Sequence, residues 1–259
     1  MHKKLAGARV RFALVRTTSG GVNLPRSSSF PHPRTPHPRT PVFLGHYGLA
    51  FAAKRAAPRT SLGATFFAAQ FLDELWPILL LAGIERVRIV PGLMAANVLD
   101  FEWYPYSHSL VAALAWAVLI GFAYFAARRY GRGAWIVGVC VVSHWFLDVP
   151  MHRPDLPLWP GSRTLVGLGV WNSVPLTLTV ELALFALGLA VYLRDTRARD
   201  RVGSWGLWAM VVLLGAFFLG GTFGGAPPSV RSLAFSALGL WLFVPWAWWV
   251  DGHREAVGG

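Results

Sequence analysis

Apolar runs of about twenty residues are the feature that most constrains this chain. A helix needs about 20 apolar residues to cross the hydrocarbon core of a bilayer. We therefore predict an all-α, polytopic helical membrane protein with about six transmembrane helices. The predicted spans are 61–83, 107–127, 133–149, 172–193, 204–222 and 232–250. The stretch FLGHYGLAFAAKRAA at 43–57 is too short to span comfortably, and we expect it to form a short apolar helix before the first span.

The composition agrees with a membrane protein. Hydrophobic residues make up 54% of the chain and charged residues 14%, whereas about 25% are charged in a typical soluble protein. Many of the 13 tryptophans stand at the ends of apolar runs, as in the aromatic belts of membrane interfaces. The lipid bilayer is thus the expected partner of this chain.

Residues 1–41 differ from the rest. They contain eight Lys and Arg, no acidic residue, many Pro and Ser, and the direct repeat HPRTP. Such a segment buries too little apolar surface to fold, so we expect a disordered basic tail followed by a helical transmembrane domain at 42–255. The membrane pattern begins abruptly at Val42, and we expect the tail not to be native. Native peptides from residues 1–41 in mass spectrometry would contradict this.

The loops alternate in charge. The basic loops KRAAPR, RRYGR and RDTRARDR alternate with the loops 84–106, 150–171 and 222–230. The positive-inside rule then puts the basic loops and the C-terminus in the cytoplasm and the other loops outside. Orientation in the bilayer explains the net charge of +12 better than nucleic-acid binding does, and we expect no nucleic-acid partner.

Ionisable residues are concentrated in the first four spans. The last two spans have none, whereas the first four hold Asp73, Glu74, His108, His144, Asp148 and Glu181. A charged group near the bilayer centre costs about 2.5–3.5 kcal/mol even on insertion scales. Several such groups in one bundle need partners, protons, water or a metal ion, which favours a functional role.

The stretch SHWFLDVPMHRPD concentrates this signal. His144 and Asp148 are four residues apart, so they share one face of a helix. Pro150 should end that helix, and His152 follows at once. Imidazole and carboxylate donors suit zinc or another divalent metal, and the topology brings further polar residues to the same place. The predicted metal ligands are His46, Asp73, His108, His144, Asp148 and His152.

Structural roles remain open for several of these residues. His144 could form a hydrogen bond between helices, and His108 could be an interfacial side chain. Glu181 could orient a ligand, act as a general base, or be a structural carboxyl group. Asp155 could act as the base or fix the loop, and Cys140, the single cysteine, excludes a cysteine-rich metal site.

Several segments resemble a known family. GHYGLAFAAKRAAPRTSLG, FLDELWP, YPYSHSL and SHWFLDVPMHRPDLPLWPG resemble bacterial membrane-bound predicted metal-dependent hydrolases, a group that includes LexA-regulated inner-membrane proteins. The resemblance covers about residues 42–255 and implies a bacterial inner-membrane location and a divalent-metal site. The polar positions of the family map onto the six predicted ligands.

Three functions are compatible with this pattern. The first is a hydrolase that acts on an ester or phosphoester, possibly a lipid or lipid phosphate, at the extracytoplasmic face, with Glu181 and Asp155 as candidates for the catalytic base. The second is a permease, because proton relays also use intramembrane carboxylates and histidines. The third is a structural membrane protein in which a metal ion only joins helices.

Overall fold

The computed structural model describes residues 44–257; the tail predicted at 1–41 lies outside the described residues. Helices carry nearly all of the regular structure in this part of the chain, and its strands pair only into two-stranded ribbons. The all-α prediction is therefore confirmed.

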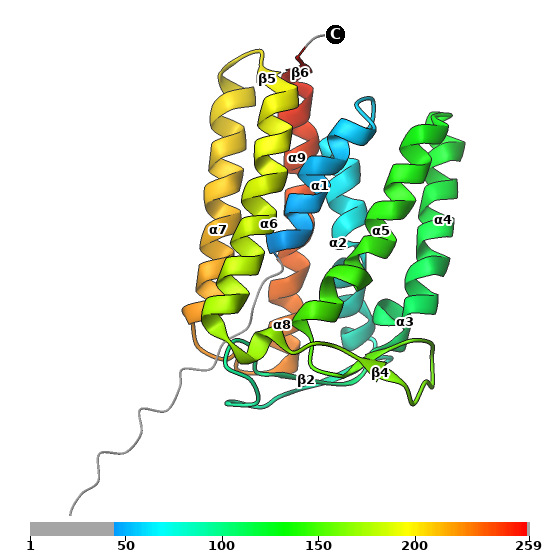
Figure 1. Ribbon diagram of the computed structural model, residues 1–259, viewed down its shortest axis with the longest axis vertical. Coiled ribbons are helices and arrows are strands. Elements are labelled where there is room, and N and C mark those ends of the chain that lie inside the picture. The colour runs from blue at the N-terminus through cyan, green and yellow to red at the C-terminus, as the bar shows by residue number, and fades with distance from the viewer. Residues whose placement is uncertain (1–43, 258–259) are drawn as a thin grey trace, which may run out of the picture. The chain divides into compact units, whose positions relative to one another are not determined.

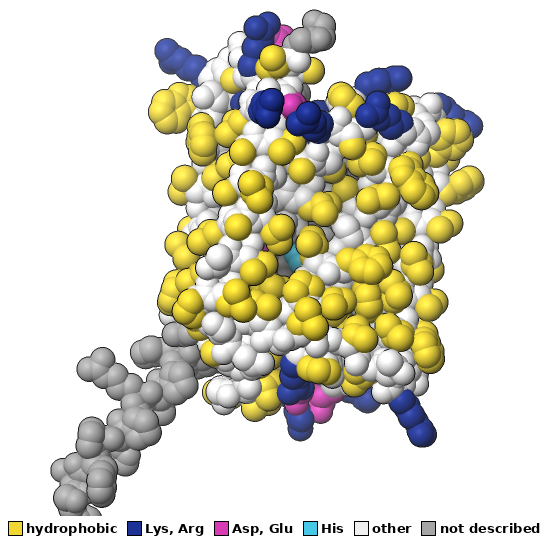
Figure 2. Space-filling view, in the orientation of Figure 1, with side chains coloured by type: hydrophobic (Ala, Val, Ile, Leu, Met, Phe, Trp, Pro, Cys, Tyr) yellow, Lys and Arg dark blue, Asp and Glu magenta, His cyan; other side chains and the backbone are white. Residues whose placement is uncertain are grey.

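Six helices in the described chain are long and apolar enough to cross a membrane. They are α2 (Leu62–Leu81), α4 (Leu110–Arg128), α5 (Gly131–Met151), α6 (Val174–Asp195), η2 (Val202–Gly206) continued by α7 (Leu207–Phe223), and the run of α8 (Val230–Leu238), η3 (Gly239–Leu242) and α9 (Phe243–Gly252). They stand side by side (Figure 1). On the face drawn in Figure 2, apolar side chains cover the middle and Lys and Arg gather near the ends. This is the architecture of a multi-pass membrane protein.

Local signals set the helix ends close to the predicted ones. Ser61 caps α2 by accepting a hydrogen bond from the N–H of Ala64, and Ser109 caps α4 in the same way. Because Ser109 is extended, α4 begins three residues later than predicted, after the separate short helix α3 (Pro105–His108). We expected Pro150 to end α5, but the helix runs on to Met151. A proline inside a helix removes its own N–H bond and crowds the carbonyl oxygen four residues earlier, but the N–H of His152 still bonds the carbonyl oxygen of Asp148 at 2.9 Å.

The connections gather at two ends of the bundle (Figure 1). The loop end comprises residues 82–109, 150–173 and 224–229; the basic end comprises residues 54–61, 129–130, 194–201 and 252–257. At the loop end, β1 (Arg86–Ile89) pairs with β2 (Leu99–Trp103), and β3 (Leu156–Pro157) pairs with β4 (Leu165–Val166). At the basic end, β5 (Thr196–Ala198) pairs with β6 (Arg254–Ala256). We expected loops at 84–106, 150–171 and 194–201, and these loops contain the strands β1 to β5.

Helix α1 (Leu44–Ala56) does not cross the bundle. Its 13 residues reach only about 20 Å at 1.5 Å per residue, and it begins at mid-height and ends at the basic end (Figure 1). It packs most extensively against α6. A Cβ atom on Gly48 would lie 2.3 Å from the carbonyl oxygen of Leu184, and one on Gly188 would lie 1.8 Å from that of Gly48. Only glycine permits this backbone approach, which fixes the depth of α1.

A partly buried carboxylate joins the helices at the basic end. Asp251, at the end of α9, accepts hydrogen bonds from Lys54 Nζ (2.5 Å), the N–H of Leu62 (3.0 Å) and the hydroxyl of Tyr192 (2.9 Å). These donors come from α1, α2 and α6. Both oxygens of Asp251 therefore have partners, and the network ties α1 to its neighbours.

Candidate metal centre

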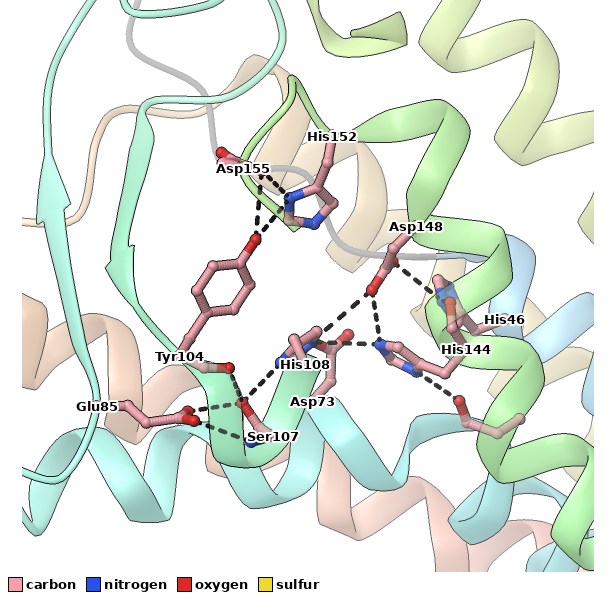
Figure 3. Close-up of polar contacts among 11 residues, drawn as sticks. His46, Asp73, Glu85, Tyr104, Ser107, His108, His144, Asp148, His152 and Asp155 are labelled. Carbon is pink, nitrogen blue, oxygen red and sulfur yellow. Dashed lines mark hydrogen bonds and ion pairs between the residues drawn. The ribbon is translucent and has the colours of Figure 1, made fainter. Parts of the chain in front are cut away.

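Histidine and aspartate side chains from four helices meet inside the bundle, near the N-terminal end of α1 (Figure 3). Five of the six predicted ligands lie in this cluster. They are His46 on α1, Asp73 on α2, His108 on α3, and His144 and Asp148 on α5. All five side chains are buried, and His144 and Asp148 expose none of their surface. The cluster thus lies in the apolar interior of the domain, where charged groups need compensation.

Neighbouring donor atoms of the cluster are spaced as two ligands of the same metal ion would be. Asp73 Oδ1 lies 3.3 Å from His108 Nε2 and 3.7 Å from His144 Nε2. Asp148 Oδ2 lies 3.5 Å from His144 Nε2 and 3.9 Å from His108 Nε2, and its Oδ1 lies 3.4 Å from His46 Nε2. Ligands held at about 2.0–2.2 Å in a tetrahedral zinc site are separated by about 3.3–3.6 Å. The observed separations are close to this range.

The carboxylates of the cluster have unused acceptor capacity. Neither oxygen of Asp148, nor Oδ2 of Asp73, receives a hydrogen bond within the part of the chain that the structure describes. Burying an ionised carboxylate without a hydrogen bond is costly, and a bound cation removes this cost. Two groups of three donors could hold a metal ion, His46 with His144 and Asp148, and Asp73 with His108 and His144. The residues present therefore fit a divalent cation.

Hydrogen bonds orient His144 and His108 toward the cluster. The Nδ1–H of His144 donates to the carbonyl oxygen of Ala69 at 2.7 Å, which leaves Nε2 as the nitrogen that faces the carboxylates. His108 Nδ1 lies 2.7 Å from Ser107 Oγ, and this hydroxyl donates to Glu85 Oε2 at 2.6 Å. The serine oxygen therefore accepts from Nδ1–H, and Nε2 of His108 also faces the carboxylates. Such outer partners fix the tautomer of metal-binding histidines.

Glu85 and Ser107 belong to the site, although no pattern in the sequence distinguishes them. Glu85 is buried and also accepts the backbone N–H groups of Tyr106 (2.8 Å) and Ser107 (2.9 Å). The carboxylate thus anchors the start of α3 as well as the serine hydroxyl. Glu85 and Ser107 are 22 residues apart, and Glu85 lies in a connection while Ser107 lies in the four-residue helix α3, so no helical or strand periodicity could relate them.

His152 and Asp155 form a neighbouring cluster with Tyr104. His152, the sixth predicted ligand, belongs to neither group of three donors, and its Nδ1 lies 2.9 Å from Asp155 Oδ1. The hydroxyl of Tyr104 donates to the same oxygen at 3.3 Å, and Arg153 Nε donates to Asp155 Oδ2 at 3.1 Å. Burial, and then the charge of Asp155, raise the pKa of Tyr104 well above its usual value, so its hydroxyl remains a donor.

Glu181 lies at the buried N-terminus of α1. Its Oε2 accepts the N–H of Gly45 at 2.6 Å, and the side chain is 2% exposed. The structure thus places this candidate base where a helix N-terminus presents unpaired N–H groups. Glu74, next to Asp73 on α2, is fully buried, and its carboxylate oxygens accept no hydrogen bond within residues 44–257.

Chemically, the cluster offers imidazole nitrogens and carboxylate oxygens, which suit a divalent cation that keeps an exchangeable position. No protein-family model, curated protein or solved structure matches this chain. Its geometry therefore carries the functional interpretation.

Proposed function

We propose that this protein is a membrane-embedded, metal-dependent hydrolase that cleaves an ester or phosphoester. One observation carries the proposal: four other buried donor side chains lie in one cluster with Asp148, and neither oxygen of this carboxylate receives a hydrogen bond among the described residues. The resemblance to membrane-bound metal-dependent hydrolases supports the same function. Zinc is the proposed metal, since histidine and aspartate ligands without cysteine are typical of its catalytic sites.

The proposed chemistry divides between metal and protein. A bound divalent ion would polarise an ester or phosphoester oxygen and lower the pKa of a water molecule. Asp73, His108, His144 and Asp148 would hold the ion, with His46 beside them. Ser107 and Ala69 would keep the two imidazoles in the required tautomer, and the surrounding apolar helices would exclude bulk water.

The proposed substrate is a lipid or a lipid-linked phosphate. An amphipathic substrate could reach the centre from within the bilayer, and a histidine is visible among the apolar side chains at mid-height in Figure 2. We propose the bacterial inner membrane, with the basic end and the C-terminus in the cytoplasm, because Lys and Arg of the short connections gather there. A cysteine at Ser162 should then react with an impermeant reagent from outside, and one at the exposed Ala198 should not.

Elemental analysis and a lipid assay test the function together. Detergent-purified protein should contain a divalent metal that the variants His144→Ala and Asp148→Ala lose, whereas His253→Ala, in the distant pair with Asp200, should keep it. Wild-type protein should hydrolyse a member of a panel of phospholipids and polyprenyl phosphates, and a chelator should stop it. Activity that survives both chelation and His144→Ala would overturn the proposal.

A permease is the second candidate, and Glu74 is the observation that favours it. This carboxylate lies inside a spanning helix and accepts no hydrogen bond from the described residues, and carboxylates inside membrane spans are the groups that proton relays use. Metal binding without turnover, together with proton or solute uptake into proteoliposomes, would support it. Metal binding with neither turnover nor uptake would indicate a structural metal that joins the helices.

A further inference from the structure

The pair of His152 and Asp155 is enclosed beside the candidate metal centre. The imidazole of His152 is 1% exposed, and ring contacts surround it, with centroid distances of 4.3 Å to Trp171 and 4.9 Å to Phe101. Asp155 receives Arg153 Nε at 3.1 Å and the Tyr104 hydroxyl at 3.3 Å. The carboxylate is thus an ion-paired anion with a fixed orientation, and the ring it faces has little freedom to turn.

The hydrogen bonds determine which nitrogen of His152 carries the proton. An ionised carboxylate only accepts hydrogen bonds, so the 2.9 Å contact between His152 Nδ1 and Asp155 Oδ1 requires Nδ1–H. In neutral imidazole the other nitrogen, Nε2, then has a lone pair. This tautomer is the one that a general base needs when it faces its substrate.

The lone pair of Nε2 faces the metal centre. In Figure 3 this nitrogen of His152 is turned away from Asp155, toward the space bordered by Tyr104, His108 and Asp148. His152 is close enough to Asp148 to interact with it electrostatically. Its nitrogens nevertheless belong to neither group of donors that could hold an ion, so the ring stands beside the centre rather than in it.

We infer that His152 is the proton-transfer residue of this site, and that Asp155 and Tyr104 are positioning residues that act through it. The inference rests on the proposed hydrolase function and replaces our predictions of His152 as a ligand and of Asp155 and Glu181 as bases. His152 Nε2 takes one proton from the attacking water as the water oxygen bonds to the carbonyl carbon or phosphorus. The bond to the leaving oxygen then breaks, and the imidazolium returns its proton to that oxygen. One water and one ester thus give one acid and one alcohol.

The first test measures metal content and turnover in the same preparations. The probes are p-nitrophenyl butyrate, a carboxyl ester, and bis(p-nitrophenyl) phosphate, a phosphodiester, both added to detergent-purified protein. His152→Ala should keep the wild-type metal content and lower kcat about 10²–10⁴-fold, the usual contribution of a general base. Free imidazole should restore part of this activity in His152→Ala, a rescue that a merely structural role would not allow. Asp155→Asn should lower kcat with little change in KM.

A second readout does not depend on turnover. In protein labelled with ¹⁵N-histidine, His152 should give the Nδ1–H tautomer, and adding Zn²⁺ should change the ¹⁵N shifts of His108 and His144 strongly and that of His152 Nε2 little. His253 provides the matched control, since its Nδ1 lies 2.6 Å from Asp200 at the other end of the molecule. His253→Ala should match wild type in kcat and should not respond to imidazole.

The outcomes separate the two proposals. Loss of metal from His152→Ala, or a strong ¹⁵N shift of its Nε2 on Zn²⁺ binding, would make His152 a ligand and overturn the inference alone. Wild-type kcat in His152→Ala would also overturn it alone. If metal-loaded wild-type protein cleaves neither the two probes nor any lipid of the panel, the proposed function fails and the inference fails with it.

Discussion

Two aspartates, the partly buried Asp251 and the fully buried Asp148, show how the same side chain serves different purposes in this bundle. At the basic end, both oxygens of Asp251 accept hydrogen bonds, from Lys54, Leu62 and Tyr192. Inside the bundle, neither oxygen of Asp148 accepts one from the described residues, although three imidazoles lie within 3.9 Å. A saturated carboxylate stabilises the fold, whereas an unsaturated one is maintained at a cost to stability. The difference identifies the candidate ligand site without reference to any relative.

The largest expected effect comes from Asp148→Asn. This change keeps the size of the side chain and removes its charge, so metal affinity should fall by more than about 100-fold, the upper range for outer-sphere partners. Metal-free Asp148→Asn should lose less stability than Asp251→Asn, because the imidazoles nearest Asp148 lie at 3.4–3.9 Å, whereas Asp251 accepts three hydrogen bonds. Metal titration and thermal unfolding in detergent test both statements; a large loss of stability in the metal-free variant would remove the distinction between the two aspartates.

Asp251→Asn should show the reverse pattern. It leaves Lys54 without its charged partner in a nearly buried position, and breaking such a pair typically costs about 3 kcal/mol or more. We therefore expect a lower unfolding temperature with an unchanged metal content per folded protein. Metal loss from Asp251→Asn that still unfolds at the wild-type temperature would contradict the structural role.

Ser107→Ala tests whether the orientation of His108 matters. It removes the hydroxyl between His108 and Glu85, and we expect a loss of metal affinity of about 10–100-fold. Ser143→Ala is the matched control, because Ser143 precedes His144 as Ser107 precedes His108, but its hydroxyl donates to the carbonyl oxygen of Cys140 within the same helix. Equal affinities for the two variants in isothermal titration would refute the proposed relay.

The smallest expected effect concerns Asp100 at the loop end. Partial burial raises the pKa of Asp100, but the hydrogen bond from Arg88 and the charge and hydrogen bond of Arg153 outweigh this and lower it below its usual value. A pKa lowered by folding stabilises the protein above the pKa of the unfolded state, and this stabilisation is lost as the pH falls through the folded value. The free-energy difference between wild type and Asp100→Asn should therefore stay constant from pH 8 to about 5 and shrink below about pH 4.

The size of this effect should be under about 1 kcal/mol, because the partners of Asp100 are partly exposed and screened. Unfolding measured over this pH range checks it. A difference that shrinks already near pH 6 would point to a histidine instead of Asp100.

The sequence predicted the spans and most of the cluster for separate reasons. The spans could be predicted because bilayer thickness sets the length of an apolar run. The pairing of His144 with Asp148 could be predicted because residues four apart share one face of a helix. Both signals lie in short stretches of sequence. Lys54 and Asp251, in contrast, are 197 residues apart, and no local pattern joins them. The pairing of His152 with Asp155 depends on the extended backbone of His152, where ψ is 147°, and helical spacing does not apply beyond that residue.

The contact of Glu181 with the N-terminus of α1 could not be predicted from the sequence either. A carboxyl group in the middle of a span indicates a functional role if all of its neighbouring helices cross the whole bilayer. Here α1 begins at mid-height, so its first N–H groups face Glu181 rather than water. The sequence shows that the stretch 43–57 is short, but not how deep it lies or which helix receives it.

The depth of α1 also constrains the order in which this protein is made. Its first N–H groups find their acceptor on α6, and Gly45 and Glu181 are 136 residues apart. While α6 is still unsynthesised, α1 has no partner for these groups in the bilayer interior, where unpaired backbone groups are strongly disfavoured. Helix α1 therefore reaches its final depth only after the five helices α2 to α6 have been synthesised, so the donor His46 joins the site last although it is the first of the five cluster residues to leave the ribosome.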